Sequence, residues 1–450
     1  MRAIKYTTSE NLIMKKDFIM PTDIKMGGVK IIESEDNPLD TKFQGFGVAV
    51  TGASCFELNS MDKDSRRKFL EDIYGENGLG LSVGRLTIGS SDYSAELYSY
   101  DDVENDTELI HFSVKRDEEY IIPMIKEILS IRPDIMLYAS PWSPPGWMKT
   151  GGSMCGGYMR EKFTDCYAHY ILKYIDEYEK RGIHISAVTP QNEPETNQGG
   201  KMPACMWHPD IEAEFITRLK EELDRAEKNT EIWIHDHCFS SADRVLWQLE
   251  NYPELLKNCG GAAFHYYNGN IEMTQPILKK YPGLKLHFTE GGPRLYDNYQ
   301  NDFCKWGAMM SKTLNNGYSS FTGWNLLLDE TGGPNIGPFF CGGLATLDSK
   351  TQTLSYSGQY RAFSHFSRFI KRGAEVYPSK ITNDGALMWG YPKMTEPGVE
   401  CCTVKNPDGS FILEIVNPKK EKAQLQFKRG GKWWYTEALP GSVVTVIFEQ

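Results

Sequence analysis

Short apolar segments alternate with longer amphipathic ones from about residue 43 to residue 370. Eight of the apolar segments have the length and composition of buried β-strands, and they lie at residues 43–50, 79–88, 134–140, 184–190, 231–237, 260–267, 284–290 and 319–328. Between them, apolar side chains recur at every third or fourth position, as in α-helices, over residues 117–131, 163–182 and 211–227. Strands that alternate with helices form parallel sheets, so eight such units predict an α/β fold, a (β/α)8 TIM barrel with long loops.

The two ends of the chain follow a different pattern. There, apolar and polar residues alternate one by one, and turns such as Pro407-Asp408-Gly409 and Pro440-Gly441 interrupt them, which is typical of antiparallel strands. We expect the N- and C-terminal strands to pair into a β-sandwich beside the barrel. The predicted domains are residues 1–42 (N-terminal strands of the sandwich), 43–370 (catalytic barrel) and 371–450 (C-terminal part of the sandwich).

Composition and charge narrow the possible partners. The chain has 450 residues and is 40% hydrophobic, enough for a large barrel and a smaller module. A net charge of −11 provides no basic field to attract phosphate, which argues against nucleic acid or an anionic membrane surface as the main partner. No run of about 18 apolar residues is present, so we expect no membrane span. The 10 Trp and 24 Tyr residues fit a sugar-binding cleft, where rings stack on the C–H faces of a pyranose, although aromatic residues are more often core.

The cysteines and the first residues bear on localisation. The N-terminal sequence contains no apolar segment of about 7–15 residues such as a secretory signal has, and this favours a cytoplasmic protein. The ten cysteines are scattered without a C-x-x-C pair, and the adjacent Cys401 and Cys402 are poorly placed for a disulfide. We therefore expect reduced thiols.

Two glutamates stand at the ends of predicted strands. Glu193 follows the fourth strand in the segment Asn-Glu-Pro, and Glu290 ends the seventh, before two glycines. In a (β/α)8 barrel the active site forms at the C-terminal ends of the strands, so both carboxylates should face the same rim. Asp and Glu are abundant in this chain, at 60 residues, but this placement is more specific than a random pair.

Two facing carboxylates are what glycoside hydrolysis requires. One attacks or stabilises the anomeric carbon, and the other protonates the leaving oxygen and then deprotonates water. Carboxyl groups about 5–5.5 Å apart retain the anomeric configuration, whereas a separation of about 6.5–9.5 Å leads to inversion. The nucleophile must be ionised while the acid is protonated, so their environments must differ.

Six motifs point to one family. They are "GFGVAVTGAS" (45–54), "GRLTIGSSDYS" (84–94), "SPWSPPGWMKT" (140–150), "QNEP" (191–194), "FTEGG" (288–292) and "GWNLLLDETGGPN" (323–335). With these motifs the chain resembles glycoside hydrolase family 30, the glucosylceramidase-like retaining β-glycosidases, over nearly its whole length. The third motif is highly specific, because two Trp and three Pro rarely occur in that order by chance. The family fold, a barrel with a side β-sandwich, agrees with the hydrophobic pattern.

The resemblance implies roles for particular residues. Glu193 matches the general acid/base and Glu290 the nucleophile. Asn192 matches a residue that hydrogen-bonds the sugar 2-hydroxyl. The other residues expected to bind substrate are Asp92, Trp142, Tyr267 and Trp324, of which Tyr267 also donates to the nucleophile.

Three further residues are expected to support the site. Arg85 matches an arginine whose fixed charge keeps the nucleophile ionised. His265 and Asp236 are expected behind the residues that touch the sugar, although a buried and satisfied histidine is an alternative reading of His265. The resemblance also implies a cis peptide bond between Trp324 and Asn325, and it implies neither a cofactor nor a metal.

The sequence limits the range of possible substrates only in part. The resemblance implies a carbohydrate or glycoconjugate, and we expect exo-action on a terminal β-glucoside-like sugar. Thr51-Gly52 and Ile336 depart from the family pattern and put glucosylceramide, and with it a role in sphingolipid metabolism, in doubt. β-Xylosides, β-fucosides, β-1,6-glucans and glucuronoxylan remain alternatives. The loops at 151–160 and 197–210 should set the site for the leaving group.

Other classes of function fit less well. His235 and His237 share a face of one strand and could bind zinc, but Asp236 points the other way and no further His pair completes a site. A non-catalytic carbohydrate-binding protein would usually have lost one of the glutamates, and both are present. Nothing in the sequence favours a structural or signalling protein, and the sequence does not determine the oligomeric state.

Overall fold

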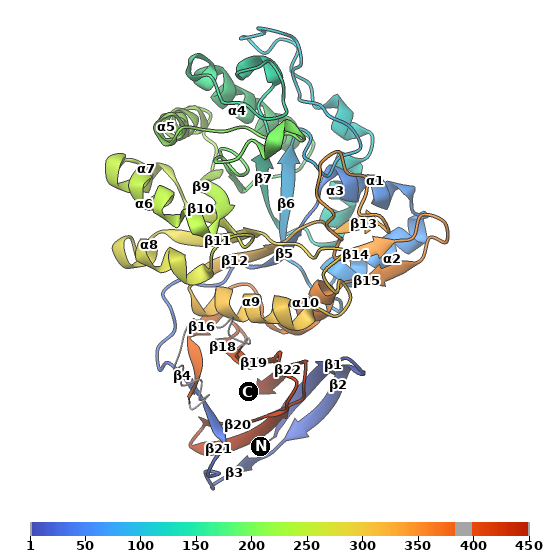
Figure 1. The fold of residues 1–450 in the computed structure, drawn as a ribbon, viewed down its shortest axis with the longest axis vertical. Coiled ribbons are helices and arrows are strands. Elements are labelled where there is room, and N and C mark those ends of the chain that lie inside the picture. Colours follow the sequence, from blue (N-terminus) through green and yellow to red (C-terminus); the bar gives the residue numbers. More distant parts are fainter. Residues whose placement is uncertain (1, 383–397, 449–450) are drawn as a thin grey trace.

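The barrel is closed by eight parallel strands, as predicted. The structure is a computed structural model that describes residues 2–382 and 398–448 (Figure 1). The barrel strands are β5 (Gly45–Ala49), β6 (Val83–Ile88), β7 (Met136–Pro141), β8 (Ala187–Val188), β9 (Glu231–Cys238), β10 (Gly261–His265), β11 (Lys285–Glu290) and β12 (Tyr318–Gly323). Each overlaps one predicted strand. β12 closes the barrel by pairing with β5, with Ser320 opposite Gly45.

Helices surround the barrel and join its strands. They are α1 (Gly52–Ser60), α2 (Lys63–Tyr74), α3 (Ile121–Ile131), α4 (Thr164–Lys180), α5 (Pro209–Arg225), α6 (Ala242–Asn251), α7 (Leu255–Asn258), α8 (Gln275–Lys280), α9 (Phe303–Asn315) and α10 (Gly358–Phe369). Short 3-10 helices lie at Lys115–Glu118, Gly146–Met148, Glu161–Phe163, Gln198–Gly200, Phe239–Ser241 and Ile271–Thr274. The three predicted helices correspond to α3, α4 and α5, and the first begins with a separate 3-10 turn. The local sequence explains where two of these helices begin: the Asp62 side chain caps α2, and Pro209 occupies the first turn of α5.

The last predicted strand ends earlier than its apolar run suggests. β12 stops at Gly323, and Asn325 has a φ of +60° that turns the chain away from the barrel. Asn tolerates this left-handed conformation better than most residues. The following residues join a separate three-stranded sheet made of β13 (Leu327–Asp329), β14 (Ala345–Leu347) and β15 (Leu354–Tyr356).

The chain ends form two sheets beside the barrel, which confirms the predicted sandwich (Figure 1). One has the order β16-β18-β19-β22-β1-β2 and the other β17-β4-β20-β21-β3. Their strands are β1 (Ala3–Ser9), β2 (Leu12–Ile19), β3 (Pro21–Thr22), β4 (Lys30–Ser34), β16 (Glu375–Tyr377), β17 (Ser379–Thr382), β18 (Glu400–Lys405), β19 (Phe411–Asn417), β20 (Ala423–Arg429), β21 (Lys432–Ala438) and β22 (Ser442–Phe448). β1 pairs with β22, which brings the two ends of the chain together. The domain limits at residues 42 and 370 stay a prediction, and part of the predicted C-terminal unit, residues 383–397 and 449–450, lies outside the described residues.

Helices α9 and α10 lie between the barrel and the six-stranded sheet (Figure 1). The contact includes a buried polar chain around His365 of α10. The His365 ring nitrogens lie 2.7 Å from Thr8 Oγ1 and 2.7 Å from Thr445 Oγ1, and Thr445 donates to Glu414 at 2.8 Å. These bonds fasten the sandwich to the barrel.

The described residues contain no helix with the length and apolarity needed to cross a bilayer. All ten cysteines are free thiols in the structure.

Candidate active site

The two glutamates meet at the rim of the barrel. Glu290 ends β11, and Glu193 lies five residues beyond the end of the short strand β8. Glu193 has a φ of +52°, and its N–H donates to the carbonyl of Asp236 at 3.0 Å. A non-glycine residue held in this region is strained and is often functional. The closest oxygens of Glu193 and Glu290 lie within 4.8 Å of each other.

A buried arginine links the nearby polar groups. Arg85 of β6 donates through Nη2 to Asp236 and to Asn192, each at 2.8 Å, and through Nη1 to Glu290. Its side chain is fully buried, so its charge is fixed beside the carboxylate of Glu290. Arg85 therefore lies where the resemblance implied, next to the predicted nucleophile.

Asp236 is the centre of this polar network. Burial alone would raise its pKa, but the charges of Arg85 and His265 outweigh burial and hold the pKa well below its usual range. Hydroxyl groups complete its hydrogen bonds, from Ser140 at 2.7 Å, Thr189 at 2.8 Å and Thr289 at 2.7 Å. The carboxylate is thus ionised and fully bonded.

A β-bulge brings Asp236 into the barrel. His235 pairs with Ala263 and His237 pairs with Phe264, so Asp236 is an extra residue in β9. His235 and Asp236 both have positive φ, at +79° and +52°. The rings of the two histidines stay close to each other, with centroids 5.9 Å apart. His235 is buried and its ring packs against Phe264, whereas His237 faces Glu193 and Glu195.

His265 connects Asp236 to both glutamates. Its Nε2 lies 3.0 Å from Asp236 Oδ1, and its Nδ1 lies 3.3 Å from Glu193 Oε1 and 4.0 Å from Glu290 Oε2. Burial lowers the pKa of His265, but the three carboxylates raise it to about 9. Burial in turn opposes ionisation of Glu193, yet the hydrogen bond and charge of His265 lower its pKa overall. In the pair formed by His265 and Glu193, the proton is therefore on the imidazole at neutral pH.

A cavity of about 150 Å³ opens above these groups. Its lining includes Trp142 and Trp324, whose stacked rings have centroids 5.3 Å apart, and the Arg85 guanidinium lies 4.8 Å from the Trp142 ring centroid. The residues that line it are Asp92, Trp142, Asn192, Glu193, Gln198, Met202, Tyr267, Glu290, Arg294, Trp324, Phe339 and Cys341. The apolar rings and the convergent polar groups suit a sugar, which has C–H faces and hydroxyls.

Asp92 offers an acceptor in this cavity. Within the described part of the chain its buried Oδ1 has no hydrogen-bond partner. Burial and the carboxylates of Glu290 and Glu193 raise its pKa well above the usual value. Tyr267 also lines the cavity, and burial and the Glu290 carboxylate raise the pKa of its hydroxyl. Both residues can hydrogen-bond a sugar held over the tryptophans.

The structure brings all ten predicted site residues together, while their catalytic and binding roles stay predictions. The cavity is lined by Asp92, Trp142, Asn192, Glu193, Tyr267, Glu290 and Trp324, and the groups behind it are Arg85, His265 and Asp236. One expectation was wrong: the peptide bond between Trp324 and Asn325 is trans, and the chain turns through the left-handed conformation of Asn325 instead.

Five lining residues were not predicted individually: Gln198, Met202, Arg294, Phe339 and Cys341. Gln198 is the most informative, because its side-chain amide donates to Glu193. Gln198 and Met202 lie in the loop at 197–210 that was expected at the mouth, but no sequence motif distinguishes them.

Comparisons with known proteins agree with this geometry. Residues 43–370 match the family model of the glycosyl hydrolase family 30 TIM-barrel domain. Mouse lysosomal acid glucosylceramidase is 27% identical over 85% of this chain and 76% of its own length. An endo-1,6-β-D-glucanase of Neurospora crassa is 29% identical over 91% of this chain and 86% of its own. Among solved structures, SrfJ of Salmonella typhimurium (25% identity, TM-score 0.88) and an endo-β1,6-glucanase (27%, 0.83) are each similar over 100% of both chains.

Proposed function

Because the chain belongs to glycosyl hydrolase family 30, we propose that it hydrolyses β-linked sugars with retention of configuration, using Glu290 as nucleophile and Glu193 as general acid/base. The observation that carries this proposal is the approach of their carboxyl oxygens to within 4.8 Å. Retaining enzymes hold the two carboxyls about 5–5.5 Å apart, and inverting enzymes, at about 6.5–9.5 Å, leave room for a water molecule between carboxylate and sugar.

In the first step Glu290 attacks the anomeric carbon. A bond forms between that carbon and a Glu290 oxygen while the glycosidic bond breaks, and Glu193 transfers its proton to the leaving oxygen. Arg85 donates a hydrogen bond to Glu290, and the Asn192 side chain, oriented by Arg85, is placed to face the sugar 2-hydroxyl. In the second step Glu193 takes a proton from water, the water oxygen attacks the anomeric carbon, and Glu290 is released.

The proton for the first step comes from the pair of Glu193 and His265. In the free protein it lies on the imidazole, 3.3 Å from Glu193. A bound sugar displaces water from the cavity, which makes the ionised carboxylate less favourable and moves the proton to Glu193. Asp236, bonded to the other ring nitrogen at 3.0 Å, holds the imidazole in place for this transfer.

We further propose that the enzyme removes a terminal β-glucoside-like sugar. The cavity, at about 150 Å³, is smaller than the roughly 300–1,000 Å³ of sites for drug-sized ligands, so it suits a single ring. Similarity to a mouse protein named as a glucosylceramidase supports a glucoside-like substrate. Endo-action on a β-1,6-glucan is the second candidate, supported by similarity to proteins named as endo-1,6-glucanases.

The experiment follows release of the aryl alcohol from β-glucoside, β-xyloside, β-fucoside and β-galactoside, with Glu290→Gln as control. We expect one sugar to be preferred, a loss of more than about 10³-fold in the variant, and a β-anomer as first product by NMR. An α-anomer would contradict retention. A linear β-1,6-glucan separates the candidates, since exo-action releases only monosaccharide and endo-action releases a ladder of oligosaccharides. Activity that survives in Glu290→Gln would refute the assignment.

A further inference from the structure

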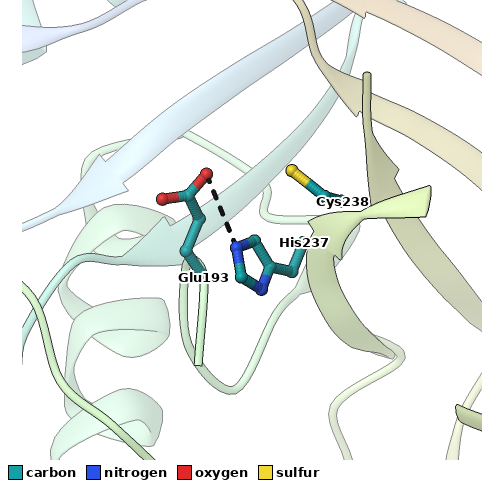
Figure 2. Close-up of side chains that lie close together, drawn as sticks. All are labelled: Glu193, His237 and Cys238. Carbon is teal, nitrogen blue, oxygen red and sulfur yellow. Dashed lines mark ion pairs between the residues drawn. The ribbon is translucent and has the colours of Figure 1, made fainter. Parts of the chain in front are cut away.

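A second group of side chains lies beside Glu193, the proposed general acid/base. Glu193, His237 and Cys238 each offer one ligand atom, and these atoms lie within 4.8 Å of one another (Figure 2). His237 Nε2 lies 4.0 Å from Glu193 Oε1. An oxygen, a nitrogen and a sulfur donor thus converge beside the cavity.

The end of β9 produces this convergence. Neighbouring residues in a regular strand point to opposite faces, so His237 and Cys238 would ordinarily diverge. Here the strand has just bulged at Asp236, and at Cys238 it enters the 3-10 helix Phe239–Ser241. Figure 2 shows the imidazole and the thiol reaching from the end of this strand toward the Glu193 carboxylate.

We propose that Glu193, His237 and Cys238 form a binding site for a borderline-soft divalent cation, with Zn²⁺ as the best match, and that the bound ion blocks the general acid/base. The inhibitory part rests on the proposed role of Glu193, whereas the binding part does not. Zn²⁺ takes carboxylate, imidazole and thiolate together, which harder ions such as Mg²⁺ and Ca²⁺ do not. Three protein ligands leave the fourth tetrahedral position for water.

The geometry requires little movement. With bonds of about 2.0–2.3 Å, the ligand atoms of a tetrahedral zinc site are roughly 3.3–3.8 Å apart. The distances here are somewhat longer: 4.0 Å between His237 Nε2 and Glu193 Oε1, and at most 4.8 Å between any two of the three ligand atoms. Each side chain would therefore move by less than about 1 Å to bind the ion. The side chains of Glu193 and His237 are only 13% and 14% exposed, and Cys238 is buried. The surrounding atoms therefore leave these side chains few alternative conformations.

A carboxylate already orients the histidine. Glu195 Oε2 lies 3.3 Å from His237 Nδ1, so the Nδ1–H donates to Glu195 and the lone pair of Nε2 faces the proposed site. Metal-binding histidines are commonly held in this way, by a carboxylate on the nitrogen that does not bind the metal. This contact is independent of the three ligands and points to the same role.

Binding has a direct chemical consequence. The thiol of Cys238 loses its proton to solvent when sulfur binds the ion, and Glu193 donates an oxygen lone pair to the same ion. A coordinated carboxylate can neither carry a proton to the leaving oxygen nor take one from water. Zn²⁺ should therefore lower the rate by roughly 10²-fold or more, the usual contribution of a general acid.

The test is a titration of the reduced full-length protein with Co²⁺, which replaces Zn²⁺ and reports its ligands by absorption. One equivalent should produce a thiolate-to-cobalt charge-transfer band, and Zn²⁺ should displace it. Cys238→Ser and Cys238→Ala should lose the band while remaining folded by circular dichroism. Cys341→Ser, which alters the other thiol beside the cavity, should keep it. Glu195→Gln should keep the band and bind roughly 10–100-fold more weakly.

Other results would overturn the proposal. Binding without a thiolate band would place the ion on Glu193, His265 and Glu290, the oxygen- and nitrogen-only cluster next to it. Absence of stoichiometric binding would refute the site outright. A normal band with an unchanged hydrolysis rate at saturating Zn²⁺, with chelator as control, would refute the inhibitory part. Because the band is read without substrate, a chain inactive on every glycoside would still give a clear answer on the site.

Discussion

His265 Nδ1 lies 3.3 Å from Glu193 Oε1, within hydrogen-bond distance. The pKa of His265 is raised to about 9, while the pKa of Glu193 is lowered, so in the free protein the proton is on the imidazole. Strongly interacting groups titrate as a pair rather than separately. A glutamate with a lowered pKa can therefore still act as an acid, because the imidazole hydrogen-bonded to it can supply the proton.

The first prediction concerns His265→Gln. In the wild type the basic limb of kcat/KM reports loss of the shared proton, near the raised pKa of His265, at about 9. The variant has no imidazole to supply a proton, so the acid can only be protonated Glu193 itself. That carboxyl loses its proton at a lower pH than the imidazole does in the wild type. We expect the basic limb to move to lower pH and the rate at pH 8 to fall by roughly 10²-fold. A pH profile with an unmoved basic limb would show that the proton is not shared.

The second prediction separates the roles of the two glutamates. Glu193→Ala should lose roughly 10²–10⁴-fold on glycosides of poor leaving groups such as methanol. It should lose far less in the first step on dinitrophenyl glycosides, whose leaving oxygen needs no proton. Pre-steady-state kinetics with both substrates measures the difference, and Glu290→Gln is the control, since it should fail on both. Equal losses on the two substrates in Glu193→Ala would contradict its proposed role as the acid.

The barrel and the two glutamates could be predicted because their signals are local. The alternation of apolar runs with amphipathic segments predicts eight strand-helix units. The end of each predicted strand then shows where the following loop begins. Glu193 and Glu290 stand at two of these ends, so their placement on one rim follows from the fold alone. Arg85 and Asp236 needed the family resemblance, because nothing in their local sequence shows that they pair across the barrel.

The remaining features depend on geometry that no short segment encodes. The bulge at Asp236 follows from the pairing of β9 with β10, and it decides that His235 is buried while His237 faces Glu193. Periodicity treats the two histidines as equivalent. Gln198 contacts Glu193 only because of positive φ angles at Gln198 and Gly199. Such contacts arise from tertiary packing and become visible only in three dimensions.

The third prediction concerns the loops at the cavity mouth. Lys149 is 1% exposed, and its ammonium donates to Ser143 Oγ (2.8 Å), the Met154 carbonyl (2.7 Å) and the Ala204 carbonyl (2.6 Å). Burial lowers its pKa to about 8. The ammonium thus joins the loops at 151–160 and 197–210, the second of which carries Gln198.

Lys149→Met should leave the Ala204 carbonyl without its donor and weaken the contact between these loops, although the Met154 carbonyl keeps the N–H of Ala204 at 3.1 Å. We expect the free energy of unfolding to fall by about 1–3 kcal/mol and KM to rise, because Gln198 no longer holds its position beside Glu193. Urea unfolding and steady-state kinetics measure the two effects. Lys201→Met, a change at an exposed lysine of the same loop, should alter neither. Unchanged stability and KM in Lys149→Met would show that the loops hold themselves in place.

The last prediction concerns pH and the sandwich. Glu414 on β19 is fully buried, accepts a hydrogen bond from Thr445 and, within the described residues, has no partner for Oε1. Burial raises its pKa to about 8. A carboxyl in the unfolded chain has a pKa of about 4.3. The folded protein therefore binds an extra proton between these two values, so the stability that Glu414 contributes at low pH is lost as the pH rises toward 8.

Glu414→Gln removes this dependence, because the amide keeps an oxygen for Thr445 and cannot ionise. At pH 5 the variant and the wild type should melt within a few degrees of each other. At pH 8 the variant should be more stable, by an amount on the order of a few kcal/mol, since each pKa unit corresponds to about 1.4 kcal/mol. Thermal melts between pH 5 and pH 9 measure the difference, with Glu33→Gln on the exposed face of β4 as the control that should show no such trend. A stability difference between Glu414→Gln and wild type that stays constant with pH would mean that Glu414 is ionised throughout, and that the polar chain through Thr445 and His365 supports a charge rather than a neutral acid.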